Sequence, residues 1–354
     1  MSDGTFNDVM FEPQYSEVLS RSTVDLSSDM GKFKLKLPVI SANMGDITGP
    51  KMSLAMYQHG AIGILHRFKK EGTDDSFGVE DYNEAYNLIL DDSKGLFSPY
   101  PELAKDPRNC IGVSIGVQAD DKARFCNLWD EGARIFCIDV ANGHHVLVKN
   151  MIHWIRRTFS VSDQPCIIAG NIATSKAAKD LTEWGADIVK VGLGSGEVCM
   201  TRKNTGVGVP QLHALKEIRE KNPYIKMIAD GGIKSTGDIA KALKYANAVM
   251  LGSFLAGTSE TPGHVYETPE GQYYKVYGGS ASGERKVQNG QNNKHVEGVV
   301  KMVPFRGKVK YILRKIKENL QSSFSYSGAN NLIEFQNKSV LKEISSGAKQ
   351  ESKF

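Results

Sequence analysis

Short apolar runs recur along the chain, and each of them ends in small or polar residues. Eight can be counted, and their interiors are rich in valine and isoleucine, as expected of strands buried on both faces. The runs are LPVISANM (37–44), AIGILH (61–66), CIGVSIGV (110–117), RIFCIDVANG (134–143), PCIIAGN (165–171), IVKVGLGSG (188–196), KMIADGG (226–232) and AVMLGS (248–253). The pattern predicts eight core strands.

Stretches with helical periodicity lie between most of these runs. Segment 176–186 spaces Ala178, Leu181 and Trp184 three residues apart, and segment 235–246 opens with a Ser-x-x-Asp helix start. Strand and helix alternating through eight units predict an α/β fold, a closed TIM (β/α)₈ barrel. An open doubly wound sheet is the alternative, but that fold seldom needs eight regularly spaced units.

Polar side chains collect where the predicted strands end. They are Asn43, Asp139, Asn142, Asn171, Asp230 and Ser253. In such barrels the active site lies at the C-terminal ends of the strands. One polar residue after a strand could simply start a turn, but the recurrence predicts a shared mouth.

Two segments fall outside the repeat. Residues 71–108 form a polar insertion that predicts a loop and a helix, and residues 267–303 form a long polar stretch with little periodicity. Loops of that length are uncommon unless functional or disordered, so we expect a mobile flap at the mouth. We expect one catalytic domain over 1–340 and a frayed tail over 341–354.

Charge and cysteine content narrow the function classes. The net charge of +4 is small for 354 residues, and the basic excess near 301–317 is typical of a solvated helix rather than a nucleic-acid site. Five cysteines without regular spacing argue against a disulfide framework and against zinc. With no secretory pattern and no run long enough to cross a bilayer, we expect a reduced, cytoplasmic protein without membrane partners.

The sharpest local motif is VGLGSGEVCMTRKNTGVGVPQ (191–211), directly after the sixth predicted strand. Its glycines, Gly192, Gly194 and Gly196, permit a tight turn and expose backbone N–H groups to an anion. Cys199 follows in a setting that favours the reactive thiolate, which predicts a nucleophile. The alternative, a buried cysteine with a structural role, suits the other four cysteines: Cys110, Cys126, Cys137 and Cys166.

The seventh and eighth strands end in MIADGGI (227–233) and VMLGS (249–253). Barrel enzymes often bind phosphate with the loops after these two strands. Gly231, Gly232, Gly252 and Ser253 would offer N–H groups and a hydroxyl, and Asp230 would accept hydrogen bonds from ribose hydroxyls. Together the motifs predict a nucleotide phosphate site.

These motifs resemble the IMP dehydrogenase and GMP reductase family over nearly the whole chain. The similarity also includes FNDVMFEPQYSEVLSRSTVDL (6–26), YGGSAS (277–282) and VEGVVKMVPFRG (296–307). The resemblance implies that Cys199 attacks C2 of a purine, that the protein is a homotetramer, and that it uses a nicotinamide cofactor.

Four features resemble the reductase branch. The cysteine loop reads CMTRKNTGVG, and IDVANGH (138–144) is similar to the reductase form of the fourth strand. About forty residues separate the second and third strands, too few for the regulatory module of most dehydrogenases. The flap segment GERKVQ (283–288) lacks the Arg-Tyr pair with which dehydrogenases activate water.

The reductase resemblance implies a reaction of purine nucleotide salvage. Cys199 would add to C2 of GMP and expel ammonia, and NADPH would reduce the resulting covalent thioimidate to IMP. The departing amino group must be protonated, and Thr201 and Glu297 match the reductase pair for that task. Lys294 lies where reductases commonly have an arginine near the base. The sequence itself does not decide between NADPH and NADH.

The same resemblance assigns further ligand contacts. Those to the substrate are Asn43, Gly196, Glu197, Asp230, Gly231, Gly232, Gly252, Ser253, Tyr277, Ser280 and Lys294. Those to the cofactor are His66, Asp139, Asn142, Gly143 and, towards a neighbouring subunit, Tyr326. His66 could instead cap a strand, and Tyr326 could be ordinary helix packing. A monovalent cation such as potassium would bind the backbone carbonyls of Gly194, Gly196 and Cys199.

Glu197 is the clearest departure from the family pattern, which commonly has serine there. A carboxylate near a dianionic phosphate repels it and tends to have a raised pKa. Either Glu197 points away, or the phosphate is held differently, or the substrate is not plain GMP. Gly279 also replaces the methionine that usually packs on the base.

Three competing functions stay open. An IMP dehydrogenase without its regulatory module would need a water activator in the flap, such as Arg285 or Lys286. A reductase of a modified purine nucleotide would account for Glu197. A non-catalytic nucleotide-sensing protein is the third, and the joint presence of Cys199, Thr201 and Glu297 argues against it.

Overall fold

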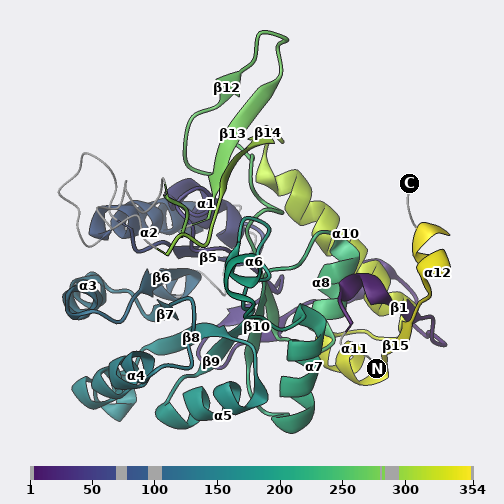
Figure 1. Cartoon of the computed structure of the whole chain (residues 1–354), viewed down its shortest axis with the longest axis horizontal. Coiled ribbons are helices and arrows are strands. Elements are labelled where there is room, and N and C mark those ends of the chain that lie inside the picture. Colours follow the sequence, from purple (N-terminus) through teal and green to yellow (C-terminus); the bar gives the residue numbers. More distant parts are fainter. Residues whose placement is uncertain (1–3, 69–77, 95–105, 280, 284–294, 352–354) are drawn as a thin grey trace.

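The computed structural model describes residues 4–68, 78–94, 106–279, 281–283 and 295–351. Eight parallel strands form a closed barrel in the order β10-β11-β4-β5-β6-β7-β8-β9 (Figure 1). They are β4 (Val39–Ser41), β5 (Ile62–Leu65), β6 (Ile111–Ile115), β7 (Ile135–Asp139), β8 (Cys166–Ile172), β9 (Ile188–Val191), β10 (Met227–Asp230) and β11 (Ala248–Leu251). The predicted strands and the TIM barrel are confirmed.

The barrel closes where its last strand meets its first. β11 pairs in parallel with β4, and Val249 lies opposite Val39. The residues of β4, β5, β6, β9 and β11 are all buried, which agrees with their continuous apolar runs. The polar residues that follow these strands therefore gather at one rim of the barrel.

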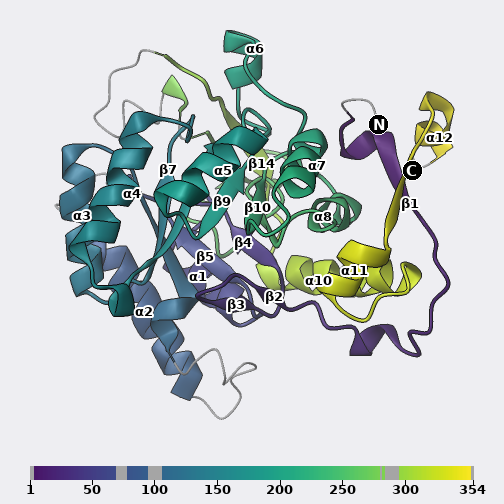
Figure 2. The same ribbon diagram turned by 90° about the horizontal axis from the view of Figure 1, so that it is seen from below.

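Most of the helices surround the barrel, while α6 projects from it and α12 lies beside the sheet of the chain ends (Figures 1 and 2). The helices are α1 (Pro50–Tyr57), α2 (Val79–Lys94), α3 (Ala119–Asp130), α4 (Val146–Thr158), α5 (Ser175–Trp184), α6 (Thr201–Thr205), α7 (Gln211–Lys221), α8 (Thr236–Leu243), α10 (Val309–Tyr326), α11 (Leu332–Lys338) and α12 (Ser346–Glu351). The predicted start of α8 is confirmed, since Ser235 and Asp238 form a reciprocal capping box. The basic helix is α10, which buries Leu313 and Ile316. Among the described residues, no helix is long and apolar enough to span a bilayer.

The two segments outside the repeat contain regular structure. In the insertion, α2 buries Tyr82, Ala85 and Ile89, while residues 69–77 and 95–105 lie outside the described part. In the expected flap, β12 (Tyr266–Glu267), β13 (Tyr273–Gly278) and β14 (Val300–Pro304) form an antiparallel sheet. The sequence pattern did not predict these strands, and Figure 1 shows the sheet projecting from the barrel. Mobility of the flap stays a prediction.

The two ends of the described chain meet in a small sheet. β1 (Val9–Glu12) pairs antiparallel with β15 (Val340–Glu343), and both views show them side by side (Figure 2). Leu341 is only 7% exposed. The tail expected to fray from residue 341 therefore continues as β15 and α12, because pairing with a distant strand covers it. A second antiparallel pair joins β2 (Ser28–Asp29) to β3 (Lys34–Leu35).

Candidate active site

A cavity of about 370 Å³ opens where the barrel strands end. Four of the six polar residues predicted at the mouth line it: Asn43, Asp139, Asn171 and Asp230. Cys199, Thr201, Glu297 and Tyr277 also line it, so the barrel, the cysteine loop and the flap sheet all contribute walls. Asn142 and Ser253 do not line this cavity.

The cysteine loop is tightly folded before it reaches Cys199. Gly192 has φ 151°, and a Cβ atom there would lie 1.8 Å from the carbonyl oxygen of Asp230. Only glycine fits so close an approach. Arg202 stabilises the fold of the loop, because its guanidinium donates hydrogen bonds to the carbonyls of Leu193 and Val209. The Arg in the CMTRKNTGVG motif thus has a structural contact of its own.

Cys199, Thr201 and Glu297 form one hydrogen-bonded row. The Cys199 Sγ lies 3.1 Å from the Thr201 Oγ1, and the Thr201 hydroxyl donates to the Glu297 Oε2 at 2.5 Å. Backbone bonds fix this arrangement: Met200 N–H donates to the Glu297 carbonyl at 2.7 Å, and Val299 N–H donates to the Val198 carbonyl at 3.1 Å. The chain that leads into β14 is therefore joined directly to the cysteine loop.

The other four cysteines lie away from the cavity. Burial raises the pKa of Cys110 and of Cys137 to about 12, and it raises the pKa of Cys166 further. Burial also raises the pKa of Cys126, although that side chain is only half-buried. Of the five cysteines, only Cys199 combines partial exposure with a place in the cavity wall.

Lys190, which the sequence motifs did not single out, joins the two expected ligand positions. Its side chain is 2% exposed, and its Nζ lies 2.7 Å from the Asp139 Oδ1 and 2.9 Å from the Asp230 Oδ2. It also donates to the Asn171 side chain. Burial alone would raise the pKa of Asp139, but the Lys190 ammonium more than offsets this and lowers the pKa. The one sequence signal for Lys190 is that a charged residue occurs within an apolar strand.

The segment after β5 places a second cation at the mouth. Arg67 and Phe68 line the cavity, and the Arg67 Nε is buried without a hydrogen-bond partner among the described residues. The Arg67 charge also helps to lower the pKa of Asp139. His66 lies just outside the cavity wall, where its Nδ1 accepts from the Phe68 N–H and its carbonyl accepts from Arg124. Contact between His66 and the cofactor stays a prediction.

Glu197 faces Lys301 rather than the mouth cavity. Burial would raise the pKa of its carboxyl, but hydrogen bonds from Lys301 and Ser253 more than offset this and lower the pKa. In the protein alone, Lys301, 104 positions along the chain, supplies the neutralising charge. The Lys301 Nζ also lies 5.8 Å from the centroid of the Tyr277 ring.

The expected phosphate loops lie next to this pair. Ser253 hydrogen-bonds the Tyr277 hydroxyl, and burial followed by the Glu197 charge raises the pKa of Tyr277. A side chain at Gly252 would crowd the same hydroxyl, since a Cβ there would lie 3.1 Å from it. Gly231 and Gly232 turn the chain after β10 with φ of 91° and 78°, a conformation that favours glycine.

Several expected contacts lie away from the cavity or outside the described residues. Asn142 is exposed, and the Gly143 N–H donates a hydrogen bond to the Asn171 carbonyl at 2.7 Å. Tyr326, which is 57% exposed, receives a hydrogen bond from Arg21 at the far end of α10. Ser280 and Lys294 fall outside the described residues.

The expected cation site uses backbone carbonyls of the cysteine loop. The carbonyl of Gly196 already accepts a hydrogen bond from the Cys199 N–H at 3.1 Å. Among the described residues no cluster of histidine, cysteine and carboxylate side chains could hold a metal ion. Binding of potassium by these carbonyls stays a prediction.

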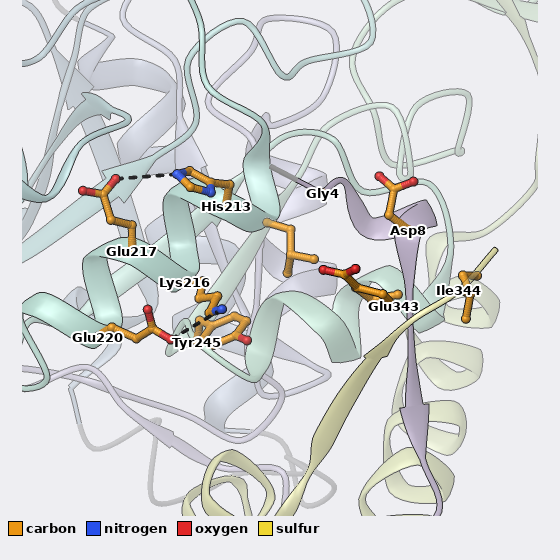
Figure 3. A pocket seen from close by; sticks show the side chains of 11 residues that line it. Gly4, Asp8, His213, Lys216, Glu217, Glu220, Tyr245, Glu343 and Ile344 are labelled. Carbon is orange, nitrogen blue, oxygen red and sulfur yellow. Dashed lines mark ion pairs between the residues drawn. The ribbon is translucent and has the colours of Figure 1, made fainter. Parts of the chain in front are cut away.

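A second cavity of about 330 Å³ lies far from the mouth, between α7 and the sheet of the chain ends (Figure 3). The charges on its α7 side are paired: His213 lies 3.9 Å from Glu217, and Lys216 lies 3.7 Å from Glu220. No cysteine lines this cavity. The hydrogen-bonded row at the barrel mouth is therefore the better candidate for chemistry.

Comparison with known proteins agrees with this architecture. Residues 3–354 match the model of the IMP dehydrogenase / GMP reductase domain. A GMP reductase from an Acidovorax species is 35% identical, with 94% of this chain and 93% of the relative covered. An inosine-5'-monophosphate dehydrogenase from Nitrosopumilus maritimus is 30% identical, with 98% of this chain and 97% of the relative covered.

A solved structure is similar over almost the same extent. A GMP reductase variant from Trypanosoma brucei, crystallised in complex with guanosine 5'-monophosphate, superposes with a TM-score of 0.84 at 25% identity. The alignment covers 99% of this chain and 97% of that one. The chain therefore belongs to the IMP dehydrogenase and GMP reductase family of TIM-barrel oxidoreductases.

Proposed function

We propose that the chain is a GMP reductase, which reductively deaminates GMP to IMP and ammonia. The observation that carries this proposal is the hydrogen-bonded row of Cys199, Thr201 and Glu297. Similarity to several GMP reductases at 34–36% identity over most of their length supports the choice of branch.

The row accounts for both proton movements that the reaction needs. When the Cys199 sulfur bonds to C2 of GMP, its proton can pass through the Thr201 hydroxyl to Glu297. The C2–N bond then breaks, and the same route delivers a proton to the departing amino group, which leaves as ammonia. The product of these steps is a covalent thioimidate on Cys199. Because the Thr201 hydroxyl already donates to Glu297, only small movements are required.

The residues at the other side of the cavity fit a nicotinamide cofactor. The buried and unpartnered Arg67 Nε can donate to a polar group of the cofactor, and Phe68 offers a ring face beside it. Asp139, fixed by Lys190, can accept from a ribose hydroxyl or an amide. When bound, NADPH would supply the hydride that converts the intermediate at C2 to IMP.

Two specific observations keep other functions in view. An IMP dehydrogenase would use the same cysteine, but it needs a water activator in residues 284–294, which lie outside the described part. A reductase of a modified purine nucleotide is motivated by Glu197. The Lys301 partner weakens that argument, because the pair as a whole repels a phosphate far less than a lone carboxylate does.

The decisive assay mixes purified protein with GMP and NADPH and follows nicotinamide absorbance, with IMP plus NAD in parallel. We expect NADPH oxidation with GMP, and IMP and ammonia as products. NAD reduction with IMP, giving XMP, would instead assign the chain to the dehydrogenase branch. Activity in neither mixture would contradict both the reductase and the dehydrogenase assignments, and modified purine nucleotides would then be tested as substrates. Light scattering on the same preparation tests the homotetramer that the resemblance implies.

A further inference from the structure

β13 carries Tyr277 from a projecting sheet into the wall of the mouth cavity (Figure 1). On the same sheet Tyr266, Tyr273 and Met302 are about half exposed, whereas Tyr277 is 3% exposed. Gly279, just past the end of β13, also lines the cavity. The way β13 is attached to the barrel rim therefore sets the shape of this wall.

The first attachment comes from Asp46, in the turn after β4. The Gly279 N–H donates to the Val299 carbonyl at 3.0 Å, so the N–H of Gly278 points to the opposite edge of the strand. There it donates to the Asp46 Oδ2 at 2.9 Å, and Asp46 is 8% exposed. β12 pairs with the first two residues of β13 and does not reach this point. The Asp46 carboxylate therefore takes the place of a neighbouring strand.

The second attachment comes from Lys275, two residues before Tyr277 and so on the same face of β13. Lys275 is 2% exposed, and its Nζ donates to the carbonyl of Thr258 at 3.2 Å and to that of Thr261. Both carbonyls belong to the chain after β11, which also carries Ser253, the hydrogen-bond partner of the Tyr277 hydroxyl. One face of β13 is thus bonded to the chain after β11 on both sides of the strand end.

The two attachments are also related by charge. Burial lowers the pKa of Lys275, the negative charges of Glu260 and Asp46 offset part of this fall, and Lys51 adds to it. A buried ammonium is costly unless acceptors and opposite charges surround it. Asp46 therefore stabilises the charged form of Lys275 as well as binding the backbone of β13.

We propose that Asp46 and Lys275 are positioning residues, which attach β13 to the barrel rim and so hold Tyr277 and Gly279 in place for the substrate. The inference rests on the proposed function for the identity of that substrate, GMP. Neither side chain lines the cavity, so both act through the strand.

Loss of either attachment should affect binding more than the chemical step. Glu297 is held against the cysteine loop by the Met200 N–H, which donates to its carbonyl at 2.7 Å, and this bond does not involve β13. The value of kcat should therefore change little, while displacement of Tyr277 and Gly279 weakens GMP binding. A merely structural role would reduce the amount of folded enzyme and leave KM unchanged.

The test compares Asp46→Ala, which removes the acceptor, with Asp46→Asn, which keeps an oxygen for the Gly278 N–H. The matched control is Asp187→Ala. Asp187 also accepts from a backbone N–H, that of Ile167 at 2.7 Å, but it lies at the opposite end of the barrel, where β8 and β9 begin. The measurements are KM for GMP and kcat at saturating NADPH, hydrogen exchange over residues 273–279 by mass spectrometry, and circular dichroism as a check of folding.

Asp46→Ala should raise KM for GMP about tenfold, the order of one charge-assisted hydrogen bond, and residues 273–279 should exchange faster. Asp46→Asn should restore most of both properties, and Asp187→Ala should change neither. An unchanged KM in Asp46→Ala would overturn the proposal. So would an equal rise in Asp187→Ala, or an Asp46→Asn variant as impaired as Asp46→Ala.

Lys275→Met tests the second attachment with the same measurements. We expect a similar rise in KM, and the variant that combines it with Asp46→Ala should show less than the product of the two single effects, because both act on one strand. A full product would overturn the joint role. If Lys275→Met does not fold, the Asp46 variants decide the question.

Hydrogen exchange separates a failure of this inference from a failure of the proposed function. If the native protein does not turn over GMP, exchange over residues 273–279 still reports whether β13 is attached through Asp46. Faster exchange in Asp46→Ala that Asp46→Asn reverses would support the attachment without the reductase. Unchanged exchange would overturn both.

Discussion

Lys190 lies within β9 between valine neighbours, and it is nearly inaccessible to solvent. A buried ammonium is costly unless it is paired and hydrogen-bonded, and here two carboxylates and an amide surround it. Those carboxylates, Asp139 and Asp230, are the groups expected to contact cofactor and ribose. We infer that Lys190 is a positioning residue that holds both ligand positions in one geometry.

Replacing Lys190 by methionine should destabilise the fold. The change keeps most of the side-chain volume but leaves Asp139 and Asp230 without their cation, which should cost about 3 kcal/mol at neutral pH. Chemical unfolding followed by circular dichroism measures the loss. Lys176→Met is the control, because Lys176 pairs with Asp180 at the surface and should cost less than about 0.5 kcal/mol. Equal losses would contradict the argument.

The loss caused by Lys190→Met should also depend on pH. In the native protein the pKa of Asp139 is lowered, so its ionised form stabilises the fold above its unfolded pKa of about 3.9, and this contribution fades as pH falls through the lower folded pKa. Without Lys190, burial raises the pKa instead, and protonation at acid pH relieves the variant. The difference in the free energy of unfolding between the variant and the native protein should therefore be smaller at pH 4.5 than at pH 7. A constant difference would point to packing alone.

Cys199 can be tested against a cysteine that the structure separates from the site. Cys199→Ala should lower turnover of GMP by at least about a thousandfold, because no covalent intermediate can form, while GMP should still bind. Cys126→Ala, on α3, should leave turnover unchanged. Steady-state rates and GMP titration together separate chemistry from binding. Appreciable turnover by Cys199→Ala would remove the basis of the proposed mechanism.

At the scale of elements, the segment before β14 holds the cysteine loop in place. Gly298 forms bridges with both Cys199 and Ser282, so three stretches of chain meet at one glycine. A Cβ atom at Gly298 would lie 2.9 Å from the Ser282 backbone nitrogen, which has no room to yield. The chain that leads into β14 therefore holds Glu297 against the loop that carries the nucleophile.

Gly298→Ala should separate catalysis from stability. The added methyl group must push the flap from the cysteine loop, and a displacement near 1 Å can lower kcat about a hundredfold. The free energy of unfolding should change little, because the barrel core is not touched. Gly347→Ala, where the nearest atom to a new Cβ is 3.7 Å away, is the control. An unchanged kcat in Gly298→Ala would show that the flap contact does not position the row.

The elements differ in how well the sequence could predict them. The barrel strands were predictable because both faces of each are buried, which leaves long apolar runs. The flap strands were not, since they show no regular apolar pattern: Tyr266, Tyr273 and Met302 are exposed, while Lys275 is buried. The same limit applies to β15, whose partner lies at the other end of the chain.

At the scale of the whole molecule, the site combines local motifs with distant pairings. Cys199, Asp230 and the glycine turns could be predicted because each occurs in a short motif at a strand end. The pairing of Glu197 with Lys301 could not be predicted, because the two residues lie in different elements and neither local sequence indicates the contact. Lys190 was missed for a related reason: one lysine does not disturb the apolar pattern of a strand.

The sheet of the chain ends contributes to the stability of the whole domain. Leu341 packs in a strand pair, and the adjacent Phe11 and Phe335 rings lie 5.2 Å apart. Leu341→Ala should lower the free energy of unfolding by about 2–3 kcal/mol because it empties a buried position. Lys342→Ala, exposed on the same strand, should have little effect. Thermal and chemical unfolding measure both, and equal stability of the two variants would mean that the end sheet is dispensable.

The pairing of β1 with β15 also has a consequence for the order of synthesis. More than 300 residues separate the paired strands, so β1 leaves the ribosome long before its partner exists. The edge of β1 stays open while the barrel strands are made, and an open strand edge is a template for pairing with other chains. A nascent chain of this protein is thus most exposed to aggregation near the end of translation, and a circular permutant that joins β15 directly to β1 would shorten that interval.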